Sequence, residues 1–109
     1  MIKLSESVIV RHILEYLAFI GVKAGKTKTM GVKRGNDYCF DKWLYVGFPD
    51  ITGFYKGQIF FIEAKAGKNK QSDAQIQFQQ MCKEAGILYI LAYDLDQVKA
   101  MITARGIQV

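Results

Sequence analysis

The chain has 109 residues and a formal net charge of +5, and half of its residues are hydrophobic. This length and composition fit one domain over 1–109 with a real apolar core. No apolar run reaches the roughly 18 residues that cross a bilayer, and polar residues break the N-terminus, so we expect neither a membrane span nor a signal peptide. Cys39 and Cys82 lack metal-ligand spacing, which predicts free thiols in a reducing cytoplasm.

Residues 5–20 are predicted to form an amphipathic helix capped by Ser5 or Ser7. Glu6 falls on its apolar face, whereas Glu15 falls on the opposite, solvated face. An acidic residue on the core side of a first turn has two interpretations. Glu6 either complements the helix dipole or reaches a site elsewhere in the fold. The apolar positions that define the face are Val10, Ile13, Leu17 and Ile20.

Residues 22–24 begin a short strand, and 25–37 are glycine-rich, basic and poor in large apolar groups, which predicts a mobile loop. We interpret this loop as a phosphate-contacting arm, although lysines also serve simply to keep a surface soluble. Residues 38–46 are aromatic and β-prone and are predicted to form the strand that leads into a hairpin. Within it, Trp43 and Tyr45 belong to the core or an interface rather than to base stacking. The basic residues of the arm are Lys26, Lys28, Lys33 and Arg34.

A β-hairpin over 51–62 is the centre of the predicted fold. Its arms are apolar and aromatic, and Lys56-Gly57 supplies the turn. Counting back from this turn places Asp50 opposite Glu63, and Lys65 on the face of Glu63. Two opposed carboxylates repel unless a cation lies between them. A divalent metal with a neighbouring lysine is a set suited to phosphodiester hydrolysis. The alternative is a surface hairpin with an incidental ion triad.

After a polar loop over 66–71, which adds Lys68 and Lys70 to the basic rim, Ser72 caps a helix that ends at Gly86. Gln75 points inward near the start of this helix, either as a site residue or as a plain residue at the edge of the core. Residues 87–92 form a buried strand. Asp94 caps a last helix over 95–104, whose apolar side is Val98, Met101 and Ile102.

Three short motifs carry a family resemblance. The motif Gly47-Phe48-Pro49-Asp50, followed by Glu63-Ala64-Lys65 and Ser72-Asp73-Ala74-Gln75, resembles the virus-type replication-repair nuclease (VRR-NUC) branch of the PD-(D/E)XK nucleases. The resemblance spans about Glu6 to Ile102. The order of predicted elements independently favours an α/β fold with a mixed sheet and flanking helices. This order matches the restriction-endonuclease-like αβββαβ core of that superfamily.

The resemblance implies a DNA endonuclease that depends on Mg²⁺ or Mn²⁺. Asp50 and Glu63 would bind the metal by side chain, Ala64 by its carbonyl oxygen, and Glu6 directly or through water. Lys65 would assist the attacking water, and Gln75 would position Lys65 or the phosphate.

Stand-alone domains of this kind are similar to Holliday-junction resolvases. That similarity implies a homodimer acting on branched DNA in replication, repair or recombination, of bacterial or phage origin. Two other functions stay open from the sequence. One is a DNA-binding module without catalysis, and the other is a metal-dependent phosphohydrolase of small nucleotides.

Overall fold

The computed structural model describes residues 4–27, 32–34, 37–39 and 45–105. Its centre is a four-stranded mixed sheet in the order β1-β4-β5-β6. The first three of these strands pair antiparallel and β6 pairs parallel with β5, which confirms the predicted mixed sheet. The strands are β1 (Lys23–Lys26), β4 (Ile51–Tyr55), β5 (Gln58–Ala64) and β6 (Leu88–Ala92).

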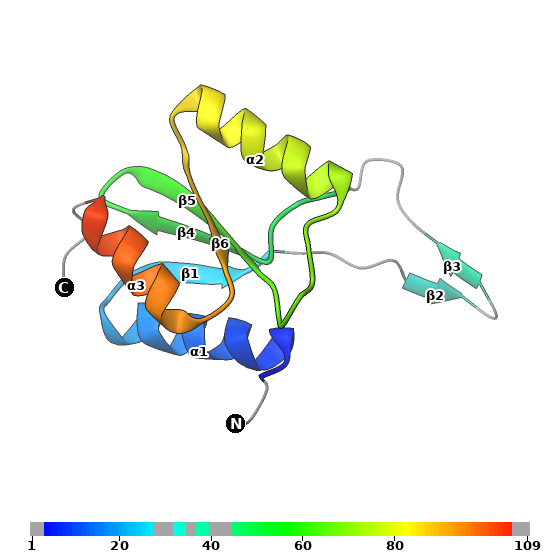
Figure 1. Ribbon diagram of the computed structural model, residues 1–109, viewed down its shortest axis with the longest axis horizontal. Coiled ribbons are helices and arrows are strands. Elements are labelled where there is room, and N and C mark those ends of the chain that lie inside the picture. The colour runs from blue at the N-terminus through cyan, green and yellow to red at the C-terminus, as the bar shows by residue number, and fades with distance from the viewer. Residues whose placement is uncertain (1–3, 28–31, 35–36, 40–44, 106–109) are drawn as a thin grey trace.

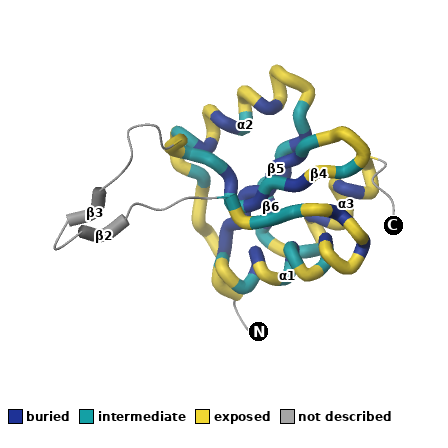
Figure 2. Tube along the Cα trace, turned by 180° about the vertical axis from the view of Figure 1, so that it is seen from behind, coloured by how far each residue is buried: buried dark blue, intermediate teal, exposed yellow. Residues whose placement is uncertain are grey.

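Helices cover both faces of the sheet, which gives three layers (Figure 1). Helix α1 (Glu6–Phe19) and helix α3 (Leu95–Ala104) pack on one face, and helix α2 (Asp73–Ala85) packs on the other. Figure 2 shows the buried residues gathered along the strands and on the inner sides of the helices. Alternate residues of β5 serve the two layers: Phe60, Ile62 and Ala64 join the α1/α3 core, whereas Phe61 joins the α2 core.

The helix ends follow the sequence signals. The hydroxyl of Ser5 accepts a hydrogen bond from the backbone N–H of Val8, and Gly86 ends α2 in the left-handed region at φ 72°. Asp94 caps α3 as predicted. One detail of α3 is wrong: Met101, predicted on its apolar side, is 41% exposed.

The central hairpin has the predicted register. Tyr55 pairs with Gln58 across the turn, and Ile51 pairs with Ile62 at the far end. Lys56 and Gly57 both have positive φ, 47° and 79°, as a two-residue turn that matches the strand twist requires. The turn therefore fixes which residues of the two arms meet at the base of the hairpin.

The region before the hairpin differs from the prediction. Part of the expected loop over 25–37 forms strand β2 (Val32–Arg34), which pairs with β3 (Asp37–Cys39) in a separate two-stranded sheet. Of the strand predicted over 38–46, residues 38–39 belong to β3, and residues 45–46 form no strand. The short strand predicted to begin at 22–24 is confirmed as β1, but its Lys-Ala-Gly-Lys sequence, which has weak β propensity, did not reveal that it pairs with β4. Residues 28–31, 35–36 and 40–44, with Lys28 and Trp43, lie outside the described part.

None of the helices in the described part is long and apolar enough to cross a membrane.

Candidate active site

The segment before β4 places Asp50 by close contact with α2. Gly47 has φ 89°, and a Cβ on it would lie 2.6 Å from the backbone carbonyl carbon and oxygen of Ala74. A side chain at this position would therefore strain its own backbone and collide with the first turn of α2. Only glycine allows the segment 47–50 to approach the helix so closely, which gives a physical reason for the first residue of the Gly-Phe-Pro-Asp motif.

An aromatic cluster supports the same segment. Phe48 lies edge-to-face with Phe61 of β5 and Phe78 of α2, with ring centroids 5.7 and 5.2 Å apart. Phe61 and Phe78 complete the triangle at 5.0 Å. Each such pair stabilises a fold by about 0.5–1.5 kcal/mol beyond its buried area. Tyr45, predicted to lie in the core or an interface, is not a core residue: it is 48% exposed, and its ring contacts this cluster only at the edge.

Thr27 fixes the backbone of Asp50 from the other side. The N–H of Thr27 donates to the carbonyl oxygen of Asp50 at 2.8 Å, and its hydroxyl donates to the carbonyl oxygen of Pro49 at 3.3 Å. The same hydroxyl shares a hydrogen bond of 2.8 Å with the hydroxyl of Thr52. Nothing in the sequence marks Thr27, because its role depends on how β1 aligns with β4, and no turn joins these two strands directly.

The Asp50 carboxylate turns toward β5. Its Oδ2 accepts a hydrogen bond of 2.9 Å from the backbone N–H of Ala64. The ladder from Tyr55–Gln58 to Ile51–Ile62, continued by one residue, places Asp50 opposite Glu63. The half-buried Asp50 side chain thus closes the base of the hairpin where the regular strand pairing ends.

Glu63 and Lys65 form an ion pair in the interior. Glu63 is 0% exposed and Lys65 8% exposed, and Lys65 Nζ lies 3.7 Å from Glu63 Oε2. By strand alternation both side chains lie on the α2 side of the sheet, while Ala64 faces the α1/α3 core. A buried carboxylate is costly unless a cation compensates it, and Lys65 supplies that charge.

Gln75 lies at the third position of α2 and is 5% exposed. Its side-chain Oε1 accepts a hydrogen bond of 2.8 Å from the backbone N–H of Ser72, while the Ser72 hydroxyl accepts one from the N–H of Gln75. This reciprocal capping box stabilises the start of the helix. Gln75 thus lies on the inner side of α2, as its helix position predicts, and in addition has a capping role that was not predicted.

Among the described residues, Glu6 does not gather with two other His, Cys, Asp or Glu side chains. It is the half-buried first residue of α1, and its Oε2 accepts a hydrogen bond of 2.8 Å from the side-chain amide of Asn69. Glu15 is exposed and pairs with Arg11 at 3.4 Å, as the helix-face argument predicts.

The predicted DNA-contacting residues in the described part lie on β1, on β2 and in the loop after Lys65. Lys26 is exposed at the end of β1, and Lys68 and Lys70 are exposed in the loop after Lys65. Lys33 and Arg34 lie on β2.

Tyr89 of β6 is a neighbour of the site that the sequence analysis did not single out. Its hydroxyl accepts a hydrogen bond of 3.2 Å from the side-chain amide of Gln71. Burial raises the pKa of Tyr89 well above the usual range for a tyrosine, and the negative charges of Glu63 and Asp50 raise it further, against the opposing effect of Gln71. A tyrosine in a buried strand normally indicates only packing, so the sequence carries no separate signal for this position.

The donor set fits one kind of metal site. Within the described part of the chain, no three His, Cys, Asp or Glu side chains gather closely enough to hold a metal ion. Mg²⁺ commonly binds through one or two carboxylates and completes its shell with water and substrate phosphate oxygens. Asp50 and Glu63 match that arrangement and do not match a cage built wholly from protein ligands.

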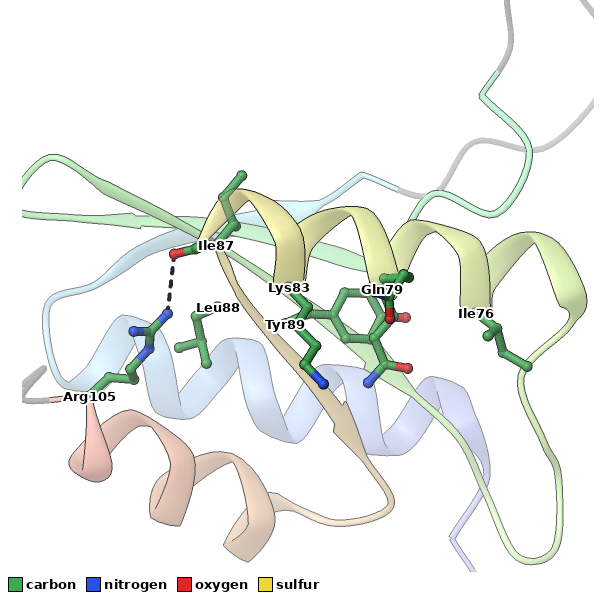
Figure 3. A pocket seen from close by; sticks show the side chains of 9 residues that line it. Ile76, Gln79, Lys83, Ile87, Leu88, Tyr89 and Arg105 are labelled. Carbon is green, nitrogen blue, oxygen red and sulfur yellow. Dashed lines mark hydrogen bonds between the residues drawn. The ribbon is translucent and has the colours of Figure 1, made fainter.

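A separate cavity lies along the side of α2, from Ile76 to Lys83. It has a volume of about 480 Å³, and Lys83, Tyr89 and Arg105 are among its lining residues. Figure 3 shows Arg105 reaching the backbone near Ile87, where its guanidinium donates to the carbonyl oxygen of Gly86 at 3.5 Å. None of the site residues predicted from the sequence lines this cavity.

A solved structure described as a VRR_NUC domain is similar to this chain. The two share a TM-score of 0.65 and 20% sequence identity over 90% of this chain and 94% of the other. The chain has the fold of a VRR_NUC domain. The fold implied by the three motifs is thereby confirmed. No protein-family model matches the sequence, and no curated protein matches it.

Proposed function

We propose that this chain is a divalent-metal-dependent nuclease that hydrolyses phosphodiester bonds in DNA. The observation that carries the proposal is the base of the hairpin, where Asp50 bonds to Ala64 beside the Glu63–Lys65 ion pair. The similarity to a solved VRR_NUC domain supports it, because that fold is the one that the three sequence motifs imply.

Each site residue has a role in this proposal. Asp50 and Glu63 would hold the metal by side chain, with the carbonyl oxygen of Ala64 as a third donor and Glu6 as a further ligand, directly or through water. When bound, a divalent metal supplies charge stabilisation at the phosphate and lowers the pKa of water. Lys65 orients the attacking water or stabilises the developing negative charge. Gln75 positions Lys65 or the phosphate from the start of α2.

The basic residues support a polyanionic substrate. A chain with a net charge of +5 and exposed lysines on β1 and beside Lys65 favours contact with a phosphate backbone. We further propose Mg²⁺ or Mn²⁺ as the metal, branched DNA as the preferred substrate, and a homodimer as the active form. These finer points rest on the resemblance to stand-alone VRR-NUC domains.

Cleavage of matched linear, flapped and four-way DNA with Mg²⁺ or Mn²⁺ tests the proposal, with Asp50→Asn as the inactive control. We expect metal-dependent cleavage by the natural chain, no cleavage by the variant, and the fastest cleavage on four-way DNA. DNA binding without cleavage under every metal condition would instead indicate a non-catalytic binding module. Hydrolysis of mononucleotides but not of DNA would indicate a nucleotide phosphohydrolase.

A further inference from the structure

Helix α2 covers only part of its side of the sheet. The hydrophobic cluster beneath α2 takes its strand residues, Ile59, Phe61 and Tyr89, from β5 and β6. Within the described part of the chain, no residue of β1 or β4 belongs to that cluster. The α2 side of these two strands is therefore a separate area of the sheet, which we call the β1/β4 face.

An aromatic ring and a cation lie together on the β1/β4 face. Phe54 of β4 is 57% exposed, and Lys23 of β1 is also exposed. The strand register pairs these two residues directly. Ile51 of β4 and Val22 before β1 belong to the α1/α3 core on the opposite side, so strand alternation places Phe54 and Lys23 on the α2 side.

The β1/β4 face continues the candidate active site. Thr52 pairs with Phe61, and Phe61 and Glu63 share one side of β5, so Thr52 and Phe54 lie on the same side as Glu63. Phe54 is four residues from Asp50, about 13 Å along an extended strand, which is the length of about four nucleotides in a stacked DNA strand. A DNA strand that enters the site can therefore reach Phe54.

Exposure of one phenylalanine is ordinary by itself, but the surroundings of Phe54 indicate a ligand. Strands β1 and β4 carry two lysines and no acidic residue. Surfaces that bind a single nucleic-acid strand combine an aromatic ring, on which a base stacks, with a cation for the backbone. Bases inside a duplex already stack on one another, so an open aromatic ring favours unpaired nucleotides.

We propose that the β1/β4 face binds unpaired nucleotides of the DNA substrate, with a base stacked on Phe54 and a phosphate beside Lys23. This proposal rests on the proposed function in taking DNA as the ligand. It narrows the substrate class to DNA with an unpaired stretch within about four nucleotides of the cleaved bond. Branched DNA offers such a stretch where its strands separate, as at a flap.

Four variants separate stacking from charge and from general apolar contact. Phe54→Leu keeps an apolar side chain and removes the ring, whereas Phe54→Trp keeps a ring. Lys23→Gln removes the cation. Phe19→Leu is the matched control, because Phe19 is 86% exposed at the end of α1, on the other side of the sheet. The measurement is affinity in EDTA, at several salt concentrations, for oligothymidylate and for a duplex of equal length.

For Phe54→Leu we expect oligothymidylate to bind about fivefold more weakly or worse, with an unchanged slope of log affinity against log salt. Its affinity for the duplex should change less than twofold, which also shows that the variant is folded. Phe54→Trp should bind oligothymidylate as tightly as the natural chain. Lys23→Gln should lower the salt slope by about 0.7, the value for one phosphate of a single strand. Phe19→Leu should match the natural chain.

Three results would overturn the inference. One is equal affinity of Phe54→Leu and the natural chain for oligothymidylate, and another is a loss of the same size in Phe19→Leu. The third is a Phe54→Leu variant that loses self-association in size-exclusion chromatography and binds oligothymidylate normally, which would make the β1/β4 face a contact between copies of the chain.

The binding measurements need no cleavage, so the inference and the proposed function fail separately. An inactive natural chain that binds oligothymidylate through Phe54 would refute the proposed nuclease and keep this inference. Metal-dependent cleavage of DNA, together with binding that does not depend on Phe54, would do the reverse.

Discussion

The Asp50 side chain continues the hairpin where the backbone pairing of β4 and β5 ends: its Oδ2 accepts a hydrogen bond of 2.9 Å from the backbone N–H of Ala64. Asp50 directly precedes Ile51, which forms the last backbone pair with Ile62. The fold therefore fixes the orientation of the carboxylate. The Thr27 contact to the Asp50 carbonyl oxygen and the close approach of Gly47 to α2 fix the same residue from two other directions.

Asp50→Asn should separate charge from geometry. An asparagine oxygen can still accept the Ala64 N–H, so the free energy of unfolding should change by less than about 0.5 kcal/mol. Cleavage should be abolished, because the metal loses a charged ligand, and DNA affinity in EDTA should persist. Denaturant unfolding, cleavage and EDTA binding assays measure the three effects.

Two further variants extend the test of Asp50→Asn. Asp50→Ala should cost about 1–3 kcal/mol, because the N–H is left without its acceptor. Glu63→Gln should abolish cleavage and also destabilise the fold, since it leaves the nearly buried Lys65 without its counter-charge. Full activity in Asp50→Asn or Glu63→Gln would refute the site assignment.

Lys65→Ala should reduce the cleavage rate by about 10²-fold or more, as expected when one transition-state group is removed. Lys65→Arg should restore it only in part, because a planar guanidinium does not reproduce a compact ammonium in a site that is 8% exposed. Single-turnover rates at saturating DNA measure this effect. A change in affinity with unchanged turnover would make Lys65 a backbone contact and nothing more.

The sequence predicted the hairpin closely because local rules determine it. Two residues with positive φ define the turn, and the period of two along each arm then places Asp50 opposite Glu63 and puts Glu63 with Lys65 on one face. The limits of α2 and α3 were equally accessible, because Ser72, Gly86 and Asp94 are strong end signals.

Long-range pairing was not accessible from the sequence. Nothing in the Lys-Ala-Gly-Lys sequence of β1 indicates that it lies beside β4, and so Thr27 was not connected with Asp50. The Asn69 contacts depend on how α1 and β6 approach the loop, and helix periodicity gave only the face on which Glu6 lies. Asn69 and Glu6 are 63 positions apart in the chain, and no periodic pattern of the sequence indicates a contact between residues so far apart.

Neutralising the basic arm tests where DNA binds. With Lys26, Lys28, Lys33 and Arg34 all changed to glutamine, DNA binding should weaken. The slope of log affinity against log salt should fall by about 0.9 for each phosphate of duplex DNA that the arm no longer neutralises. Lys56→Gln, at the opposite end of the hairpin, is the matched control and should leave the slope unchanged. An unchanged slope in the arm variant would place the DNA elsewhere.

Gln75 has one structural role and one proposed catalytic role, and two variants distinguish them. Gln75→Glu keeps an oxygen for the Ser72 N–H and so preserves the capping box, whereas Gln75→Ala should cost about 1 kcal/mol of stability. If Gln75 also positions Lys65 or the phosphate, Gln75→Glu should still reduce turnover, because it adds a negative charge near the reacting phosphate. Turnover equal to that of the natural chain in Gln75→Glu would leave capping as its only role.

Tyr89 should make the fold sensitive to high pH. Burial raises its pKa in the folded state above the value of 10.0 expected when it is exposed. Below pH 10 both states keep the proton, and its contribution to stability is fully present. Above pH 10 the unfolded state loses the proton first, so the free energy of unfolding should fall with rising pH, by up to about 1.4 kcal/mol per pH unit. Denaturant unfolding at pH 9, 10 and 11 measures this slope.

Two variants control for the other groups that titrate at high pH. Tyr89→Phe should flatten the slope, although it also removes the Gln71 hydrogen bond. Tyr45→Phe removes a hydroxyl from an exposed ring and should keep the slope. Equal slopes in the natural chain and Tyr89→Phe would show that the Tyr89 hydroxyl ionises as readily in the folded state as in the unfolded state.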